Sequence, residues 1–263
     1  MKNIQIIVAT HKKYQMPREN IYLPVHVGAE GKKRIECYTP DNQGENISLK
    51  NPYFCELTGL YWAWKNLDVD YIGLVHYRRY FTEKRKVPKN EKEKFECVLT
   101  REEVEEKLEN AEVILPKERN YFIENLYDHY KHTMYIEPLD ETRKIIEEKY
   151  PEYIAEFDKL KTRKKAHMFN MFIMKKDILE EYCNWLFDIL FELEKKMEGI
   201  EYDPFHARFY GRISELLLDV WINKNQIKYE EVRVMDMQNV NWLKKGTSFL
   251  MAKFTGKKYG KSF

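Results

Sequence analysis

The sequence predicts an α/β protein with a mostly parallel central sheet flanked by helices. Short apolar runs alternate along the chain with segments whose apolar residues recur every three or four positions, as strands alternate with helices. Hydrophobic residues make up 43% of the 263 residues, which is enough to form a substantial core. Polar residues directly follow two of the apolar runs, at the strand ends where parallel sheets bind ligands.

The strands are indicated by apolar runs of strand length that are rich in isoleucine, valine and aromatic residues. In chain order they are expected at residues 4–10, at the start of 71–81, at the end of 100–116, at 169–175 and at 229–235.

The helices are indicated by apolar stripes on one helix face. In chain order they are expected at residues 51–67, at the start of 100–116, within 120–160, at 176–197 and at 211–225. Thr100 with Glu103, and Asp177 with Glu180, have the spacing of capping boxes. The highly charged stretch 83–96 has no apolar stripe, so we expect a solvated loop there.

Overall charge and cysteine usage exclude several classes of protein. The 45 basic and 43 acidic residues leave a net charge of +2, which gives no reason to expect a nucleic-acid partner. The four cysteines are far apart and show no CxxC spacing, as is typical of reduced thiols in the cytosol. The first apolar run is too short for a signal peptide, and no stretch approaches the roughly 20 apolar residues of a membrane span. We therefore expect a cytoplasmic protein.

The stretch YIGLVHYRRYF, residues 71–81, begins as a buried strand and ends in positive charge. Arg78 and Arg79 need anionic partners if they lie at the end of a buried strand. One interpretation is that they pair with acids of the protein while His76 is a satisfied core histidine. The other is a phosphate site, because planar guanidinium groups bind phosphate through paired hydrogen bonds.

Three further segments carry polar residues whose roles the sequence leaves open. Thr10, His11 and Lys12 either form a surface turn or contact a nucleotide at the first strand end, although neither GxGxxG nor a P-loop is present. His167 and Asn170 interrupt an apolar strand, where they satisfy loop backbone or contact a substrate hydroxyl.

Arg208, Arg212 and Glu215 surround the expected start of a late helix. There, Glu215 is either a partner of the helix dipole or a general base. His129 and His132 share a helix face, but no carboxylate cluster accompanies them and no DxD motif ends a strand. We therefore expect no metal site.

Several of these stretches together resemble one family. They are residues 51–67 followed by DYIGLVHYRRYF, then KKAHMFNMFIMKKDILEEYCNWLF, then RFYGRISELLLDVWI. In this order they resemble the capsular and exopolysaccharide glycosyltransferase family marked by an HYRR motif and long described as a domain of unknown function. The resemblance extends from about residue 3 to residue 235.

The resemblance implies a GT-A-like fold and transfer of a sugar from a UDP-sugar to a saccharide acceptor in capsule or exopolysaccharide assembly. Galactofuranose and galactose are the sugars associated with some relatives. HYRR stands where other GT-A enzymes carry a DxD motif, so we expect arginines to neutralise the diphosphate with no metal cofactor required. One alternative is a transferase that uses Mn or Mg. Another is a non-catalytic scaffold that binds nucleotide or glycan.

On this resemblance we expect four groups of site residues. The donor diphosphate is expected to contact His76, Arg78 and Arg79. The nucleotide is expected near Thr10, His11, Lys12, Asn51 and Glu56. The sugar or acceptor is expected near His132, His167, Asn170, Arg208 and Arg212. Glu215 is the expected catalytic base.

The domain organisation is expected to be a transferase domain at residues 1–241, with a helical acceptor-side region, followed by a tail at 242–263. The tail is rich in lysine and aromatic residues and contains no acid. It is either a frayed terminus or a segment that binds an anionic membrane surface. Membrane binding would suit a lipid-linked acceptor and a peripheral location on the inner face of the plasma membrane.

Overall fold

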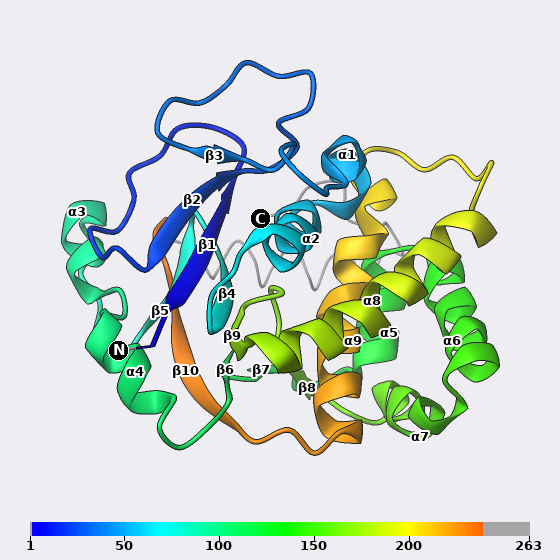
Figure 1. The fold of residues 1–263 in the computed structure, drawn as a ribbon. Helices are drawn as coiled ribbons and strands as arrows, with labels where there is room; N and C mark the ends of the chain where they lie inside the picture. Colours follow the sequence, from blue (N-terminus) through cyan, green and yellow to red (C-terminus); the bar gives the residue numbers. More distant parts are fainter. Residues whose placement is uncertain (1, 239–263) are drawn as a thin grey trace.

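The computed structural model describes residues 2–238, and the tail expected at residues 242–263 lies outside them. The described chain is an α/β fold in which the helices α5 to α9 gather to one side of the strands (Figure 1). Its strands are β1 (Ile4–Thr10), β2 (Tyr22–His26), β3 (Thr39–Pro40), β4 (Tyr71–His76), β5 (Arg79–Thr82), β6 (Val113–Pro116), β7 (Arg119–Asn120), β8 (Lys165–Ala166), β9 (Phe172–Lys175) and β10 (Tyr229–Asp236).

The central sheet of the described residues is mixed, whereas the sequence predicted a mostly parallel one. Its eight strands have the order β3-β2-β1-β4-β5-β10-β6-β9, and β9 also pairs with β4. The pairs β1–β2, β2–β3, β1–β4 and β6–β10 are parallel, while β4–β5, β5–β10, β4–β9 and β6–β9 are antiparallel. Only two residues join β4 to β5, which is too short for a parallel crossover. The prediction is therefore correct for the pairs around β1 and for β6–β10, and it is wrong for the pairs that involve β5 or β9.

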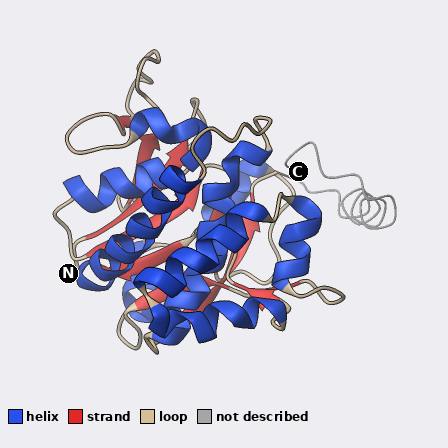
Figure 2. Cartoon of the chain, turned by 90° about the vertical axis from the view of Figure 1, so that its right-hand side faces the viewer, coloured by secondary structure: helices blue, strands red, loops and turns tan. Residues whose placement is uncertain are grey.

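Side chains of the sheet alternate between two hydrophobic cores. Ile7 and Ala9 of β1 face one core, whereas Ile6 and Val8 face the other. This period of two places a buried surface on each face of the sheet. Figure 2 shows helices stacked over the side of the sheet that faces the viewer. The strands expected at residues 4–10 and 229–235 are present, while the one expected at 169–175 begins only at Phe172.

The helices agree with the expected order but differ at several ends. They are α1 (Asn51–Phe54), α2 (Leu57–Asn66), α3 (Glu91–Lys94), α4 (Arg101–Lys107), α5 (Leu126–Thr133), α6 (Glu137–Lys149), α7 (Ile154–Asp158), α8 (Lys176–Lys196) and α9 (Phe209–Lys224), with 3₁₀ turns at Ser48–Lys50, Phe95–Cys97, Pro151–Tyr153, Lys159–Lys161 and His206–Arg208.

The structure tests the two predicted capping boxes and the predicted charged loop. The capping box of Thr100 and Glu103 is confirmed at the start of α4. The box of Asp177 and Glu180 is wrong, because α8 begins at Lys176 with Lys175 at its N-cap, and no side chain caps it. The charged stretch 83–96 contains the short helix α3, so it is only in part a loop.

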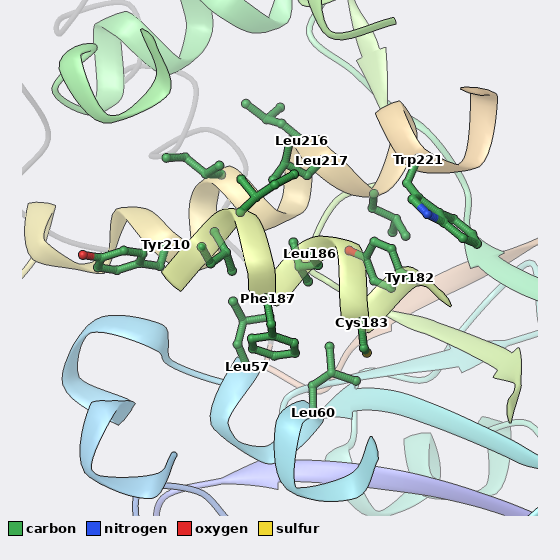
Figure 3. Close-up of a cluster of buried hydrophobic side chains, with 14 of the residues drawn as sticks. Leu57, Leu60, Tyr182, Cys183, Leu186, Phe187, Tyr210, Leu216, Leu217 and Trp221 are labelled. Atoms are coloured by element: carbon green, nitrogen blue, oxygen red, sulfur yellow. The ribbon is translucent and has the colours of Figure 1, made fainter. Parts of the chain in front are cut away.

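The long helix α8 packs between α2 and α9 and buries the apolar stripe that the sequence predicted. Figure 3 shows side chains of the three helices pointing toward one another. The labelled residues are Leu57, Leu60, Tyr182, Cys183, Leu186, Phe187, Tyr210, Leu216, Leu217 and Trp221. Within residues 2–238, no helix combines the length and the apolar character needed to cross a bilayer.

Candidate functional site

A cavity of about 970 Å³ opens at the carboxyl ends of β1 and β4, a volume suited to a nucleotide-sized ligand. It is bounded by the β4–β5 turn, the break between α1 and α2, the segment before β9, the first turns of α9, and the segment from β7 into α5. Elements distant in sequence therefore converge on one space.

The HYRR stretch forms a tight antiparallel turn, in which His76 ends β4 and is paired with Arg79 at the start of β5. The Arg79 side chain is fixed, because its Nε lies 3.1 Å from Asp236 Oδ1 and its guanidinium covers the Phe169 ring at 4.3 Å. For Arg78, no ion pair or side-chain hydrogen bond occurs within the described chain. One arginine is therefore positioned by the protein and the other is available to a ligand.

An aromatic group covers the β1 end of the cavity. The Tyr77 ring stacks on Tyr14 with centroids 3.9 Å apart, and His11 meets Tyr77 edge-on at 5.4 Å. Burial and the surrounding lysines and arginines lower the pKa of His11. Its imidazole therefore favours the neutral form at pH 7.

The helix predicted at 51–67 is interrupted at Cys55, whose φ of +54° lies in the left-handed region. Asn51 lies at the first position of α1 and donates from Nδ2 to the Cys55 carbonyl at 2.7 Å. Arg208 Nε lies 2.9 Å from Cys55 Sγ. The break places Cys55 and Glu56 in the cavity lining.

The carboxylate of Glu56 is held by Asn170, which donates from Nδ2 at 2.8 Å and donates also to the Gly211 carbonyl at 3.0 Å. Burial of Glu56 opposes its charge, but nearby His76 and the hydrogen bond from Asn170 lower the pKa below its usual value. Glu56 is therefore ionised at pH 7. Asn170 lies behind Glu56 and does not line the cavity, contrary to the expectation that it faces the sugar.

His76 completes this group. Its Nε2 lies 2.6 Å from the Phe169 carbonyl, so this nitrogen carries the proton and donates. Burial lowers the pKa of His76, with help from Arg79 and Arg78, while Glu56 opposes the shift. The ring therefore acts as a donor that fixes the backbone before β9.

Glu215 lies in the second turn of α9, because the helix begins at Phe209 and not near Gly211 as expected. The side chain is almost fully buried, and its Oε2 has no hydrogen-bond partner within the described chain. Oε1 lies 3.5 Å from Arg212 Nη1. Burial raises the pKa of Glu215, an effect that Arg212 opposes and Glu56 reinforces. A buried carboxylate of raised pKa with a free oxygen is suited to accept a proton.

The charge of the cavity is positive. Five arginines and two glutamates line it, and together these seven side chains give an excess of positive charge. The arginines are Arg78, Arg79, Arg119, Arg208 and Arg212. Such a concave positive surface attracts anions and concentrates them.

His167 lies outside the cavity lining, contrary to the expectation. Its Nδ1 lies 2.5 Å from Asp219 Oδ1 and its Nε2 lies 3.3 Å from Glu231. Glu118, His167 and Asp219 form a group with metal-like spacing in the described chain. Arg163 already lies 3.5 Å from Glu118 and 3.6 Å from Asp219, so a guanidinium supplies the positive charge there.

Two other expected residues are also placed elsewhere. His132 is exposed, and its Nδ1 lies 3.0 Å from the buried Glu124. Lys12 is exposed, with its Nζ 5.2 Å from the Tyr14 ring. Neither lines the cavity, because the first ties α5 to the preceding loop and the second points along the surface of the β1 end.

The other residues named from the sequence share the cavity lining. They are Thr10, His11, Asn51, Glu56, His76, Arg78, Arg79, Arg208, Arg212 and Glu215. The sequence reasoning missed Arg119, Tyr121 and Phe122, which no motif marks. It also missed Cys55, because the apolar spacing continues through the helix break.

Backbone strain gathers at this site. Among the described residues, six other than glycine have positive φ, and Cys55, Phe122 and Phe169 of these line the cavity. Each such residue costs roughly 1–3 kcal/mol and persists only where the surrounding structure enforces it. Strain of this kind is common at binding and catalytic sites.

Comparison with known proteins agrees with this architecture. A solved structure described as apo WbbM, a bifunctional glycosyltransferase, has a TM-score of 0.82 and 31% identity over 90% of this chain. The chain spans about half of that protein, 46% of its length. No curated protein matches. The family model described as "Domain of unknown function (DUF4422)" matches residues 5–226, and the chain belongs to this family.

Proposed function

We propose that this protein is a glycosyltransferase that moves a sugar from a UDP-sugar to a saccharide acceptor. The observation that carries the proposal is one cavity that combines arginines of the HYRR turn with a buried carboxylate whose Oε2 lacks a partner in the described chain. The 31% identity to a bifunctional glycosyltransferase supports the same class of activity.

The arginines would stabilise the leaving group. Cleavage of the bond between sugar and phosphate releases UDP, and negative charge on the diphosphate grows as the bond breaks. Arg78 is free to bind this charge, and Arg79 is held in place by Asp236 and Phe169. Preorganised cations stabilise such a transition state more than the ground state.

Glu215 would act as the base in an inverting transfer. It would accept the proton of the attacking acceptor hydroxyl through Oε2. Glu56 is less suited to this role, because Asn170 holds it and its pKa is lowered. Two carboxylates with pKa values shifted in opposite directions thus receive different roles.

No metal is required in this proposal, since arginines line the cavity where a cation would be needed. Hydrolysis of UDP-galactose, UDP-galactofuranose and other UDP-sugars, measured with and without EDTA, tests it. Turnover that resists the chelator is expected. Turnover abolished by EDTA and restored by Mn or Mg would replace it with a metal-dependent transferase. Nucleotide binding without hydrolysis of any donor would indicate a scaffold.

The biological process and the location of the protein are proposed in the same way as its activity. We propose capsule or exopolysaccharide assembly in the cytoplasm, with the tail at residues 242–263 contacting an anionic membrane that carries the acceptor. Each lysine near such a surface adds about 1 kcal/mol at low salt. Flotation with anionic and neutral liposomes tests the tail. Equal partitioning of the full chain and a chain ending at Val240 on anionic vesicles would contradict it.

A further inference from the structure

One wall of the cavity is apolar and exposed at the mouth. It is formed by the segment between β7 and α5, where Tyr121, Phe122 and Ile123 all line the cavity. Phe122 is 74% exposed and Ile123 is 58% exposed, so two large apolar side chains stand in solvent beside a group of arginines. Exposed apolar groups next to converging polar groups indicate a ligand with both kinds of surface.

The backbone holds Phe122 outward against its conformational preference. Its φ is +54°, in the left-handed region that phenylalanine rarely adopts. Asn120 Oδ1 accepts a hydrogen bond from the Phe122 N–H at 2.8 Å, and the Ile123 N–H donates to the Tyr121 carbonyl at 2.6 Å. These two bonds enclose Phe122 in a tight turn that points its ring away from the protein core.

The same segment is anchored at both ends. The Tyr121 N–H donates to the Lys164 carbonyl at 2.8 Å, and the Leu126 N–H donates to the Arg163 carbonyl at 2.9 Å. The Tyr121 ring also packs on His129, with centroids 4.1 Å apart. Phe122 is therefore presented on a fixed support, which reduces the entropy lost when a ligand packs on it.

The apolar wall is close enough to the proposed base to share its electrostatic environment. Burial raises the pKa of Tyr121 to about 12, and the charges of Arg119, Glu215 and Arg212 act on the same hydroxyl. The wall comes from the segment between β7 and α5, whereas the ends of β1 and β2 supply another part of the lining, which includes Thr10. Figure 1 places α5 among the helices, away from β1 and β2. A ligand on Phe122 is thus distinct from one at the β1 end.

We propose that Phe122 positions the acceptor by packing against the C–H face of a sugar ring; this inference rests on the transferase function proposed above. A pyranose or furanose ring has an apolar face of C–H groups and an edge of hydroxyls. The face lies on the exposed aromatic ring, and the edge is directed at the polar groups of the cavity. Phe122 takes no part in bond making; it orients the attacking hydroxyl.

The kinetic test compares two substitutions of Phe122 that differ in whether an aromatic ring is kept. Phe122→Gly removes the ring and suits the positive φ, while Phe122→Trp keeps an aromatic surface. With a methyl glycoside as the acceptor, we expect Phe122→Gly to raise the acceptor KM about tenfold or more, and Phe122→Trp to stay within about threefold of wild type. Leu49→Ala is the control, since Leu49 is 77% exposed and lies outside the cavity.

UDP affinity is measured on the same variants. It should be unchanged in Phe122→Gly. An unchanged acceptor KM in that variant would overturn the proposal. So would a matching loss of UDP affinity, which would assign the ring to the donor base.

A second measurement does not depend on turnover. In saturation-transfer NMR with UDP present, aromatic protons are irradiated and a panel of methyl glycosides in pyranose and furanose form is observed. Transfer to ring C–H protons is expected with wild type and Phe122→Trp and should be lost with Phe122→Gly. No transfer to any glycoside, or equal transfer in Phe122→Gly, would overturn the proposal. If the wild type hydrolyses no UDP-sugar but still transfers saturation to a glycoside through Phe122, only the transferase function is rejected.

Discussion

Two clusters of charged side chains lie in this fold, and they differ in how completely their members are partnered. The Asp219 cluster consists of Glu118, Arg163, His167, Asp219 and Glu231. The cavity cluster consists of Arg78, Arg79, Arg212, Glu56 and Glu215. Both draw residues from elements far apart in sequence, and both include buried charge.

The charged groups of the Asp219 cluster are paired with one another. Asp219 accepts from the His167 backbone N–H at 3.1 Å and lies 2.5 Å from its Nδ1. Arg163 lies within ion-pair distance of Asp219 and Glu118, and Glu231 reaches the other His167 nitrogen. A buried charge with this many partners is a structural connection and needs no ligand.

The charged groups of the cavity cluster are not all paired with one another in the described residues. Within the described chain, Glu215 Oε2 is buried without a hydrogen bond, and the Arg78 guanidinium has no acid. Leaving a buried polar atom unpaired costs about 1–3 kcal/mol, so a ligand that pairs with it recovers that free energy. The contrast indicates that pairing, and not residue type, distinguishes the proposed binding site from the structural ion network.

The largest expected effect is on catalysis by the cavity cluster. Glu215→Gln keeps the side-chain shape but removes the proposed base, so sugar transfer should fall about 10²- to 10⁴-fold while donor affinity is retained. Glu231→Gln is the matched control, because it neutralises an acid of the other cluster. If Glu215→Gln turns over at a near-normal rate, the base lies elsewhere.

The next effect is on stability. Asp219→Ala leaves His167 and Arg163 without their shared acid, and breaking a buried pair costs about 3–5 kcal/mol of unfolding free energy. Asp219→Asn keeps a hydrogen-bond acceptor and should cost less. Chemical denaturation measures both variants. UDP affinity of the folded fraction should be unchanged, and a selective loss of UDP binding would show that this cluster serves the ligand.

A smaller effect is expected on nucleotide binding. Arg78→Ala should weaken the binding of UDP by about 1.5–3 kcal/mol but that of uridine much less, because the proposed partner of Arg78 is the phosphate. Arg163→Ala should leave both affinities alone. Arg79→Ala is a less clean test, since it also removes the contacts to Asp236 and Phe169 and should lower stability. Calorimetry that finds equal losses for uridine and UDP would make Arg78 structural.

The sequence predicted the elements that carry regular apolar spacing, such as α8 and β1, and it located the HYRR turn beside the site. It did not predict the antiparallel pairing of β4 with β5 and β9, because strand direction depends on distant partners. The two-residue link between β4 and β5 was the local signal for a hairpin.

Cavity-lining residues were predicted where charged residues adjoin apolar runs, and they were missed where the backbone departs from regular geometry. His167 and Glu215 are both polar residues in apolar segments, and only tertiary contacts assign one to the Asp219 cluster and the other to the cavity. Cys55 and Phe122 have positive φ, which neither residue type indicates. Such conformations are imposed by surrounding contacts that one sequence does not display.

The smallest expected effect is the pH dependence of stability, in which His167 and the cavity residue His129 act in opposite directions. Burial lowers the His167 pKa, but Asp219 more than offsets this and raises it above 6.5. The folded protein therefore holds this proton more tightly, and the stabilisation is complete below pH 6.5 and lost as pH rises through the folded pKa. Burial lowers the pKa of His129 to about 4, although Glu124 opposes this. The lowered pKa of His129 therefore reduces the unfolding free energy as pH falls from 6.5 toward 4.

Urea unfolding from pH 4.5 to 8.5 separates the two histidines. In a plot of unfolding free energy against pH, the acidic limb is the fall toward low pH and the alkaline limb is the fall toward high pH. His129→Gln should flatten the acidic limb and His167→Gln should flatten the alkaline limb. Each change should be on the order of 1 kcal/mol once solvent screening is considered. Wild type should therefore be most stable between the two limbs. If His129→Gln leaves the acidic limb unchanged while His167→Gln alters it, the histidine of the partnered cluster, and not that of the cavity, governs acid sensitivity. The contrast between the two clusters would then not extend to their titration.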